Sequence, residues 1–197
     1  MSDMDINKQT NEKKEKRNIT LSLLDVFEVL VFSITVAILI FSFVMRICVV
    51  EGNSMNPTLI NGERLLVTDL CYEPEYGDVI VFHQTGAVYN EPMVKRVIAV
   101  GGETVDIDFN TWKVTVTDKN GLTRVLNETY TQFVGNPLTS NLSYPLYVPE
   151  GYVFVMGDNR FNSADSRLST IGLVDERRIL GKAILRIAPF DKFGPIN

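Results

Sequence analysis

Two side chains that could perform hydrolysis stand out in this sequence of 197 residues, Ser54 and Lys95. His83 is the only histidine, so a serine hydroxyl that attacks a carbonyl group must find another base, and lysine is the natural candidate. A lysine has to be neutral to take that proton, which requires burial to lower its pKa from the usual value of about 10.4. The pair therefore predicts amide hydrolysis by a serine nucleophile with a lysine base.

Each of these two residues lies inside a short motif. Ser54 belongs to Gly52–Leu59, a turn-rich segment, and a turn can expose the hydroxyl and aim the backbone N–H of Ser54 at the same carbonyl group. Lys95 belongs to the apolar segment Met93–Ile98, which favours a largely buried strand. An ordinary turn serine and a solvated strand lysine are the simpler alternatives, and each motif taken separately leaves them open.

A third motif, Gly157–Arg167, concentrates polar residues after an apolar run. The alternatives for it include a structured turn and a calcium-binding loop, but the charges of Arg160 and Arg167 would compete with a metal ion. Pairs of Asp and Arg that brace a loop fit better, and a serine hydroxyl from the loop could orient the lysine amine. The polar residues are Asp158, Asn159, Arg160, Asn162, Ser163, Asp165, Ser166 and Arg167.

The charge of the chain argues against a nucleic-acid partner. The net charge is −5, and six basic and six acidic residues balance within the first 46 residues, so the acidic excess lies in residues 47–197. With one histidine and two scattered cysteines, Cys48 and Cys71, a zinc set is implausible, and we expect no metal and no cofactor. We expect free thiols, although a single disulfide outside the cytosol remains an alternative.

The N-terminal region predicts a membrane anchor. Residues 1–18 are polar and charged, which is typical of a disordered tail. Val29–Met45 carries no charge, and a helix of that length rises about 26 Å, against about 30 Å for a hydrocarbon core. We therefore expect a transmembrane anchor over 19–46, with a buried core helix and a cleavable signal peptide as the alternatives. No small-residue cleavage site follows, and the basic cluster before the anchor predicts a cytoplasmic N-terminus.

Beyond residue 47 the chain predicts a mostly β fold, because short apolar runs alternate with turns and show little helical periodicity. We expect a β-rich domain formed by 47–104 and 150–197, with a small lobe, 105–149, inserted into it. Within the lobe, Trp112, Val114 and Val116 should share one face of a strand that forms a hairpin with Leu122–Leu126. The other predicted runs are Arg64–Val67, Val79–Phe82, Val94–Val100, Tyr152–Met156 and Ala183–Ala188.

Together these segments resemble the conserved boxes of the bacterial type I signal peptidases, in particular those of Gram-positive members. The order and spacing are those of the family, whereas 105–149 carries no recognisable match. The resemblance implies an antiparallel β catalytic domain of the signal-peptidase type, a small inserted β lobe and one N-terminal transmembrane helix. The matching segments are the anchor, Gly52–Leu59, Gly62–Val67, Tyr76–Phe82, Val94–Glu103 and Tyr152–Arg167.

The resemblance also implies an activity and a cellular location. It implies a membrane-anchored serine endopeptidase with a Ser/Lys dyad and no cofactor, which removes signal peptides from exported preproteins after small residues, at sites of the type Ala-x-Ala. The implied partners are signal peptides and the lipid bilayer. The implied location is the plasma membrane, with a single-pass anchor and the catalytic domain on the extracytoplasmic face.

By position, the resemblance implies a role for each site residue. Ser54 would be the nucleophile and an oxyanion donor through its N–H, and Lys95 the general base, oriented by a hydrogen bond with Ser163. Gly52 stands where some members have a serine hydroxyl, so a backbone group or water would have to supply the second oxyanion donor. Residues implied to hold the site together are Asp158, Asp165 and Arg167. Residues implied to shape two shallow pockets for small side chains are Val50, Met55, Leu59, Val81 and Val94.

Three residues depart from the family pattern: Phe161 replaces a usual acidic residue, and Gly101 and Asp175 stand where proline is common. Two other functions share some of the features. A non-catalytic relative that assists the assembly of surface structures would be expected to lose the nucleophile or the base, and both are present. A self-cleaving stress regulator with a related dyad would be soluble and would usually carry a DNA-binding domain, whereas this chain has a predicted anchor and an acidic body.

Overall fold

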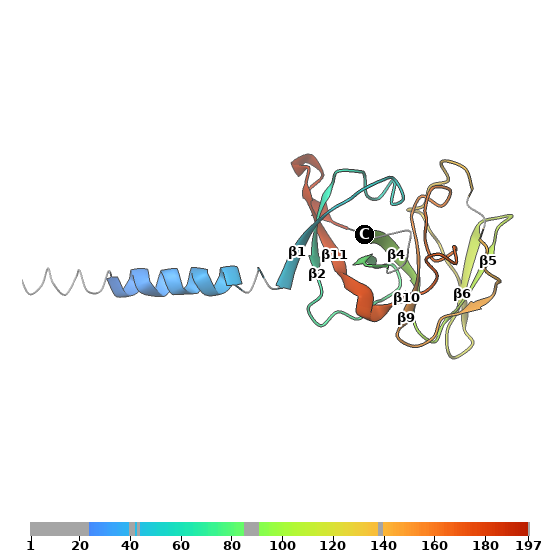
Figure 1. Cartoon of the computed structure of the whole chain (residues 1–197), viewed down its shortest axis with the longest axis horizontal. Coiled ribbons are helices and arrows are strands. Elements are labelled where there is room, and N and C mark those ends of the chain that lie inside the picture. The colour runs from blue at the N-terminus through green and yellow to red at the C-terminus, as the bar shows by residue number, and fades with distance from the viewer. Residues whose placement is uncertain (1–23, 40–41, 43, 85–90, 138–139, 197) are drawn as a thin grey trace, which may run out of the picture. The chain divides into compact units, whose positions relative to one another are not determined.

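The computed structural model describes residues 24–39, 42, 44–84, 91–137 and 140–196, and it divides the chain into two compact units, Met1–Val44 and Met45–Asn197 (Figure 1). The predicted tail, 1–18, and residues 19–23, 40–41 and 43 of the predicted anchor lie outside the described residues.

The first unit contains one described helical stretch, residues 24–39. Its two hydroxyl side chains bond back to the preceding turn, Ser33 to the carbonyl of Val29 at 2.7 Å and Thr35 to that of Val31 at 2.8 Å. Within the described ranges, no helix has both the length and the apolar character that crossing a bilayer requires. Met45 and Arg46, the predicted end of the anchor, begin a strand instead, because the apolar run passes without a turn into β-branched residues.

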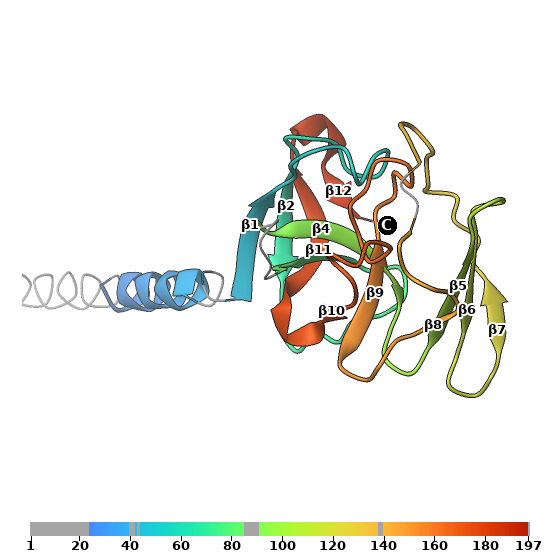
Figure 2. The ribbon, with the colours of Figure 1, turned by 45° about the vertical axis from the view of Figure 1, so that its right-hand side comes forward.

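The second unit is built mainly from an eight-stranded sheet (Figures 1 and 2). Its neighbouring strands follow the order β1-β2-β11-β3-β4-β9-β10, and β12 pairs with β11. Two short 3-10 helices, η1 (Glu176–Arg178) and η2 (Phe190–Lys192), flank β11. The strands are β1 (Met45–Val49), β2 (Arg64–Thr68), β3 (Val79–Phe82), β4 (Met93–Ala99), β9 (Tyr152–Met156), β10 (Val174–Asp175), β11 (Ile179–Ala188) and β12 (Gly194–Pro195).

A second, four-stranded sheet has the order β7-β6-β5-β8 and comes from the predicted insert together with Thr104, the residue before it (Figure 2). Its strands are β5 (Thr104–Asp108), β6 (Lys113–Thr117), β7 (Thr123–Val125) and β8 (Leu146–Tyr147). The predicted hairpin is present, since β6 pairs antiparallel with β7. The Asp118 carboxylate closes its turn by accepting from the backbone N–H groups of Asn120 and Leu122, each at 2.8 Å.

The prediction for Trp112 is wrong. Its φ of 58° places it in the left-handed region, and β6 begins only at the next residue. Trp112 therefore does not share the buried face of Val114 and Val116. Its ring packs instead against Phe109 and Phe161, with ring centroids 5.5 and 4.9 Å away.

The largest core lies between the two sheets. Strand alternation supplies it, because every second residue of β5 and β6 is buried. The cluster joins residues of β4 and β9 to residues of β5 and β6, so the second sheet is packed onto the strands that precede and follow the insert. Its buried members are Ile98, Ala99, Val105, Ile107, Val114, Val116, Val148, Phe154 and Met156.

Strand β11 is longer than predicted and crosses the middle of the first sheet, pairing with both β2 and β3. A register shift occurs where Gly181, with φ of 141°, faces the end of β2. A β-carbon at Gly181 would stand 2.4 Å from the carbonyl oxygen of Thr68, so only glycine fits there. Because Gly181 interrupts the apolar run, the sequence predicted only the later part of β11, Ala183–Ala188.

All pairings between the named strands are antiparallel. The mostly β, antiparallel fold class is therefore confirmed for the second unit. Cys48 and Cys71 are both free thiols, as expected. The fold brings the turn after β1, the middle of β4 and the loop after β9 to one place.

Candidate active site

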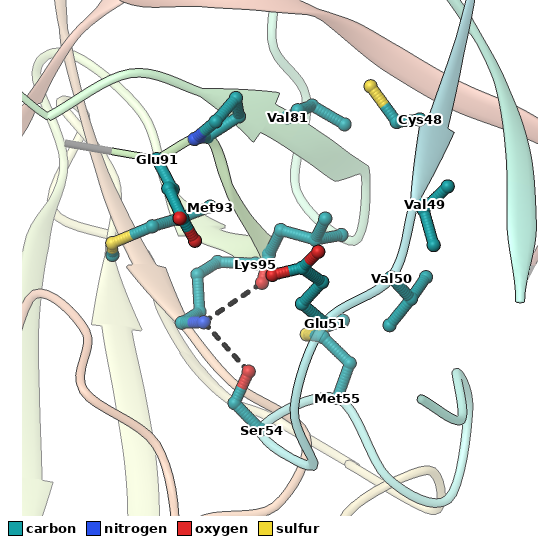
Figure 3. Close-up of a pocket in the computed structure, with 12 residues that line it drawn as sticks. Cys48, Val49, Val50, Glu51, Ser54, Met55, Val81, Glu91, Met93 and Lys95 are labelled. Carbon is teal, nitrogen blue, oxygen red and sulfur yellow. Dashed lines mark hydrogen bonds between the residues drawn. The ribbon is translucent and has the colours of Figure 1, made fainter. Parts of the chain in front are cut away.

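Ser54 and Lys95 form a direct hydrogen bond. Lys95 Nζ donates to Ser54 Oγ at 2.8 Å and to the carbonyl oxygen of Val94 at 3.0 Å (Figure 3). Lys95 lies within β4 and is only 5% exposed. The alternative of a solvated strand lysine is therefore wrong, and the simpler alternative of an isolated turn serine does not describe Ser54 either.

Burial also changes the acid–base behaviour of this lysine. Removal from water lowers the pKa of Lys95 to about 8. The carboxylates of Asp165 and Asp158 raise this pKa and the charge of Arg167 lowers it, but burial has the largest effect. A lysine with that pKa has a substantial neutral fraction near neutral pH. The side chain can therefore accept a proton under conditions where an exposed lysine cannot.

The turn that carries Ser54 is fixed at both ends. Val50 N–H donates to the carbonyl of Glu63 at 2.8 Å, and Gly62 N–H donates to the carbonyl of Val50 at 2.8 Å, so the turn is closed at its base. Met55, which directly follows Ser54, is fully buried and anchors the turn in the core. The carbonyl of Ser54 accepts a hydrogen bond from the N–H of Asn159 at 2.9 Å. The third motif therefore holds the backbone of the serine.

Asp158 joins all three motifs. Its two carboxylate oxygens accept from Arg96 Nε at 2.9 Å and from an Arg96 terminal nitrogen at 2.8 Å, and Thr58 Oγ1 donates to it at 2.5 Å. Thr58 belongs to the serine motif and Arg96 follows Lys95 in β4. Both partners of this charge-assisted pair are buried, so the pair fixes the relative position of strand and loops. Sequence reasoning missed Arg96, although its place beside Lys95 was a signal.

Asp165 and Arg167 form a second buried ion pair. Arg167 Nε donates to one oxygen of Asp165 at 2.7 Å and a terminal nitrogen donates to the other at 2.8 Å. Burial by itself would raise the pKa of Asp165, but the charge and hydrogen bonds of Arg167 and the N–H of Gly157 hold it below its usual value. The carboxylate is thus ionised and braces the loop, in agreement with the predicted Asp–Arg bracing.

Ser163 does not make the predicted hydrogen bond with Lys95. Its Oγ is buried, and no hydrogen bond joins it to Lys95. The hydroxyl packs against Gly157, where a β-carbon would stand 2.2 Å from Ser163 Oγ and 2.5 Å from the carbonyl oxygen of Ser54. Ser163 therefore lies beside the serine turn, and Gly157 is a second residue whose importance sequence reasoning missed.

A pocket of about 610 Å³ opens beside the pair (Figure 3). Four of the five predicted pocket residues line it: Val50, Met55, Val81 and Val94. Leu59 does not, because it is completely buried in the hydrophobic cluster that also contains the first three. The remaining lining residues are Cys48, Val49, Glu51, Ser54, Glu91, Pro92, Met93 and Lys95. Among the residues that the structure covers, no group of three or more His, Cys, Asp or Glu could hold a metal ion.

The chain is similar in sequence to known proteins. The family model "Signal peptidase, peptidase S26" matches residues 23–188. Signal peptidase I of Bacillus licheniformis is 35% identical over 188 residues, which cover 94% of this chain and 95% of that protein. Signal peptidase I T of Bacillus subtilis (strain 168) is 34% identical over 189 residues, which again cover 94% and 95%. A crystal structure of a signal peptidase I from Enterococcus faecalis V583 aligns with a TM-score of 0.41 and 26% identity, over 56% of this chain and 97% of that chain.

The family match includes the turn with Ser54, the strand with Lys95 and the loop after β9. The two Bacillus relatives match over nearly their whole length. The chain therefore belongs to the signal peptidase family, peptidase S26, a family of serine endopeptidases.

Proposed function

We propose that this chain is a membrane-anchored endopeptidase that removes signal peptides from exported preproteins, with Ser54 as the nucleophile and Lys95 as the general base. The observation that carries the proposal is the 2.8 Å contact between the Lys95 amine and the Ser54 hydroxyl at a buried lysine. Burying an ammonium group is unfavourable, and a use for its neutral form explains why it is retained.

In the first half of the reaction, the neutral amine of Lys95 accepts the proton of the Ser54 hydroxyl while Oγ bonds to the scissile carbonyl carbon. The carbonyl oxygen becomes an oxyanion, and the backbone N–H of Ser54 is the proposed donor for it. The Lys95 ammonium then gives its proton to the departing amine. The new N-terminus of the mature protein leaves, and the signal peptide remains as an ester on Ser54.

In the second half, a water molecule gives a proton to Lys95 and bonds to the ester carbonyl. The tetrahedral intermediate collapses, the Lys95 proton returns to Ser54 Oγ, and the signal peptide leaves as a carboxylic acid. Asp158, Asp165 and Arg167 take no part in these bond changes. They hold the strand and loops that present the two reacting groups.

The pocket supports a preference for small side chains. Its volume of about 610 Å³ suits a short stretch of extended peptide. Val50, Met55 and Val81 are almost fully buried, so they form firm walls rather than side chains that can swing aside. A firm wall excludes large side chains sterically, while the small groups that it accepts contribute little binding energy each. Such walls support the proposed cleavage after Ala-x-Ala.

The proposed anchor is the segment 19–44, with the N-terminus in the cytoplasm and the β-rich unit on the extracytoplasmic face of the plasma membrane. Alkaline carbonate extraction of membranes that contain the chain tests the anchoring. We expect the chain to stay in the membrane pellet and the β-rich unit to be open to protease only from the extracytoplasmic side. Release into the supernatant would contradict a spanning anchor.

The activity is tested with the detergent-solubilised full chain and a preprotein that carries an Ala-x-Ala site, followed by sequencing of the new N-terminus. We expect one cut, directly after the second alanine, and loss of the cut when either alanine becomes leucine. Ser54→Ala serves as the control for contaminating proteases. A cut at another position, or equal cleavage of the leucine substrates, would contradict the proposed specificity.

A further inference from the structure

Residues 128–134 of the insert, here called the strap, lie along the third motif. Gln132 N–H donates to the carbonyl of Asp158 at 2.9 Å, and Arg160 N–H donates to the carbonyl of Gln132 at 2.8 Å. These two hydrogen bonds make a parallel bridge between Gln132 and Asn159. The strap comes from the part of the sequence that carries no family motif, yet it is bonded to the loop that holds the Ser54 backbone.

A buried ion pair reinforces this attachment. Both carboxylate oxygens of Glu128 accept from Arg160, one from Nη1 at 2.6 Å and the other from Nη2. Arg160 is 1% exposed, and its Nε donates to the carbonyl of Gly157 at 3.1 Å. A guanidinium held by two parallel bonds has one defined orientation. Glu128 thus fixes the side chain that holds the Gly157 carbonyl.

The strap also reaches the strand that carries Lys95. Tyr130 donates from its hydroxyl to Glu128 at 2.9 Å, and the Arg96 guanidinium stacks over the Tyr130 ring, 4.1 Å from its centroid. Arg96 neighbours Lys95 in β4 and binds Asp158. The Glu128 carboxylate therefore contacts both Arg160, which bonds the loop beside Ser54, and Tyr130, which stacks on the neighbour of Lys95.

We propose that Glu128 is a positioning residue for the dyad, acting through Arg160 on Gly157 and through Tyr130 on Arg96. Gly157 packs directly against the Ser54 carbonyl and the Ser163 hydroxyl, so a shift of the loop moves the attacking oxygen relative to Lys95 Nζ. A displacement of about 1 Å in a reacting group can lower a rate about a hundredfold. This inference rests on the proposed peptidase function, and it gives the insert a role in positioning the two reacting side chains.

The test compares three variants of the full chain in detergent, using the Ala-x-Ala preprotein and a thermal melt of each protein. Glu128→Leu with Arg160→Met removes both charges together, because deleting one partner alone would leave a buried charge, whereas apolar replacement of a buried pair is often neutral or stabilising. Glu128→Asp keeps the charge but shortens its reach by one methylene. Arg124→Lys is the matched control for Glu128→Asp, since it also keeps the charge of an ion pair while changing its geometry, and the pair of Arg124 with Glu103 at 2.8 Å touches neither the strap nor the third motif.

We expect the double variant and Glu128→Asp to melt above the assay temperature and to lose about tenfold to a hundredfold in kcat with KM nearly unchanged. Arg124→Lys should keep the kcat of the unaltered chain. A kcat within about twofold of the unaltered chain in either folded strap variant would overturn the proposal, and so would a loss in Arg124→Lys as large as theirs. If the double variant does not fold, Glu128→Asp alone decides. Absence of cleavage by the unaltered chain, or cleavage by Ser54→Ala, would instead defeat the proposed function.

Discussion

Gly157 lies so close to Ser163 that a β-carbon on the glycine would stand 2.2 Å from the serine Oγ. The same β-carbon would stand 2.5 Å from the Ser54 carbonyl oxygen, which is a backbone atom and cannot turn away. The missing side chain of Gly157 thus lets the third motif lie directly against the serine turn. The glycine is required for close approach and not for a left-handed backbone.

Gly157→Ala should therefore abolish most of the cleavage activity. The added methyl group has to push the Ser54 carbonyl away, and overpacking of this kind typically costs about 1–3 kcal/mol of stability besides the displacement of the nucleophile. Gly194→Ala is the matched control, because a β-carbon there meets nothing within 4 Å. Cleavage rates and melting temperatures of both variants check this, and near-normal activity in Gly157→Ala would show that the turn can shift without harm.

Ser163→Ala should lower the cleavage activity and leave the stability of the fold nearly unchanged. The Ser163 Oγ is buried and makes no hydrogen bond with Lys95, so its removal should change the melting temperature little. Because Ser163 packs against Gly157, which lies against the Ser54 carbonyl, cleavage should fall without disappearing. A drop in melting temperature together with full activity would identify Ser163 as a purely structural residue.

The site could be predicted from sequence only where a motif carried it. Ser54, Lys95 and the third motif were recognisable, but their contacts connect residues 41 to 106 positions apart, and no spacing rule gives such distances. The Glu128–Arg160 ion pair could not be predicted from the sequence, because Glu128 lies in a segment without any motif. The Lys95–Ser163 bond was expected from resemblance alone, and the structure places the hydroxyl against Gly157 instead.

The fold was predictable where apolar runs had turns at both ends. Strands β3 and β9 match their predicted bounds because glycine or charged residues flank them. Strand β1 was missed because the apolar run of the predicted anchor continues into it without a break. The start of β11 was missed because Gly181 and Lys182 interrupt its apolar pattern, although Gly181 is required by the contact with Thr68.

Lys95→Met should stabilise the protein at about pH 7 while removing its activity. The pKa of Lys95 is about 8 in the folded chain and 10.5 as a free side chain. Well below pH 8 both states are protonated, and the folded state bears the full cost of the buried ammonium, on the order of 3 kcal/mol. Between these two pKa values the folded state has lost its proton and the unfolded state has not, so stability rises with pH.

The free energies of unfolding of Lys95→Met and the unaltered chain, measured by denaturant titration, check this prediction. The variant should be more stable at about pH 7, and its advantage should shrink steadily toward about pH 10. A Lys95→Met protein that is less stable than the unaltered chain at about pH 7 would mean that the charged amine contributes to folding.

The role of Lys95 as a general base is tested most directly by the pH dependence of kcat/KM between about pH 6 and 10, for the unaltered chain, Lys95→Arg, Lys95→Ala and Ser54→Ala. Only the neutral amine accepts a proton, so kcat/KM should rise about tenfold per pH unit on the acid side and level off above a midpoint near pH 8. Arginine keeps the charge but has a pKa above 12 and cannot take the Ser54 proton, so Lys95→Arg should be as inactive as Lys95→Ala. All three variants should show no cleavage at any pH. Near-normal cleavage by Lys95→Arg, or any cleavage by Ser54→Ala above the level of a chain-free control, would contradict the dyad.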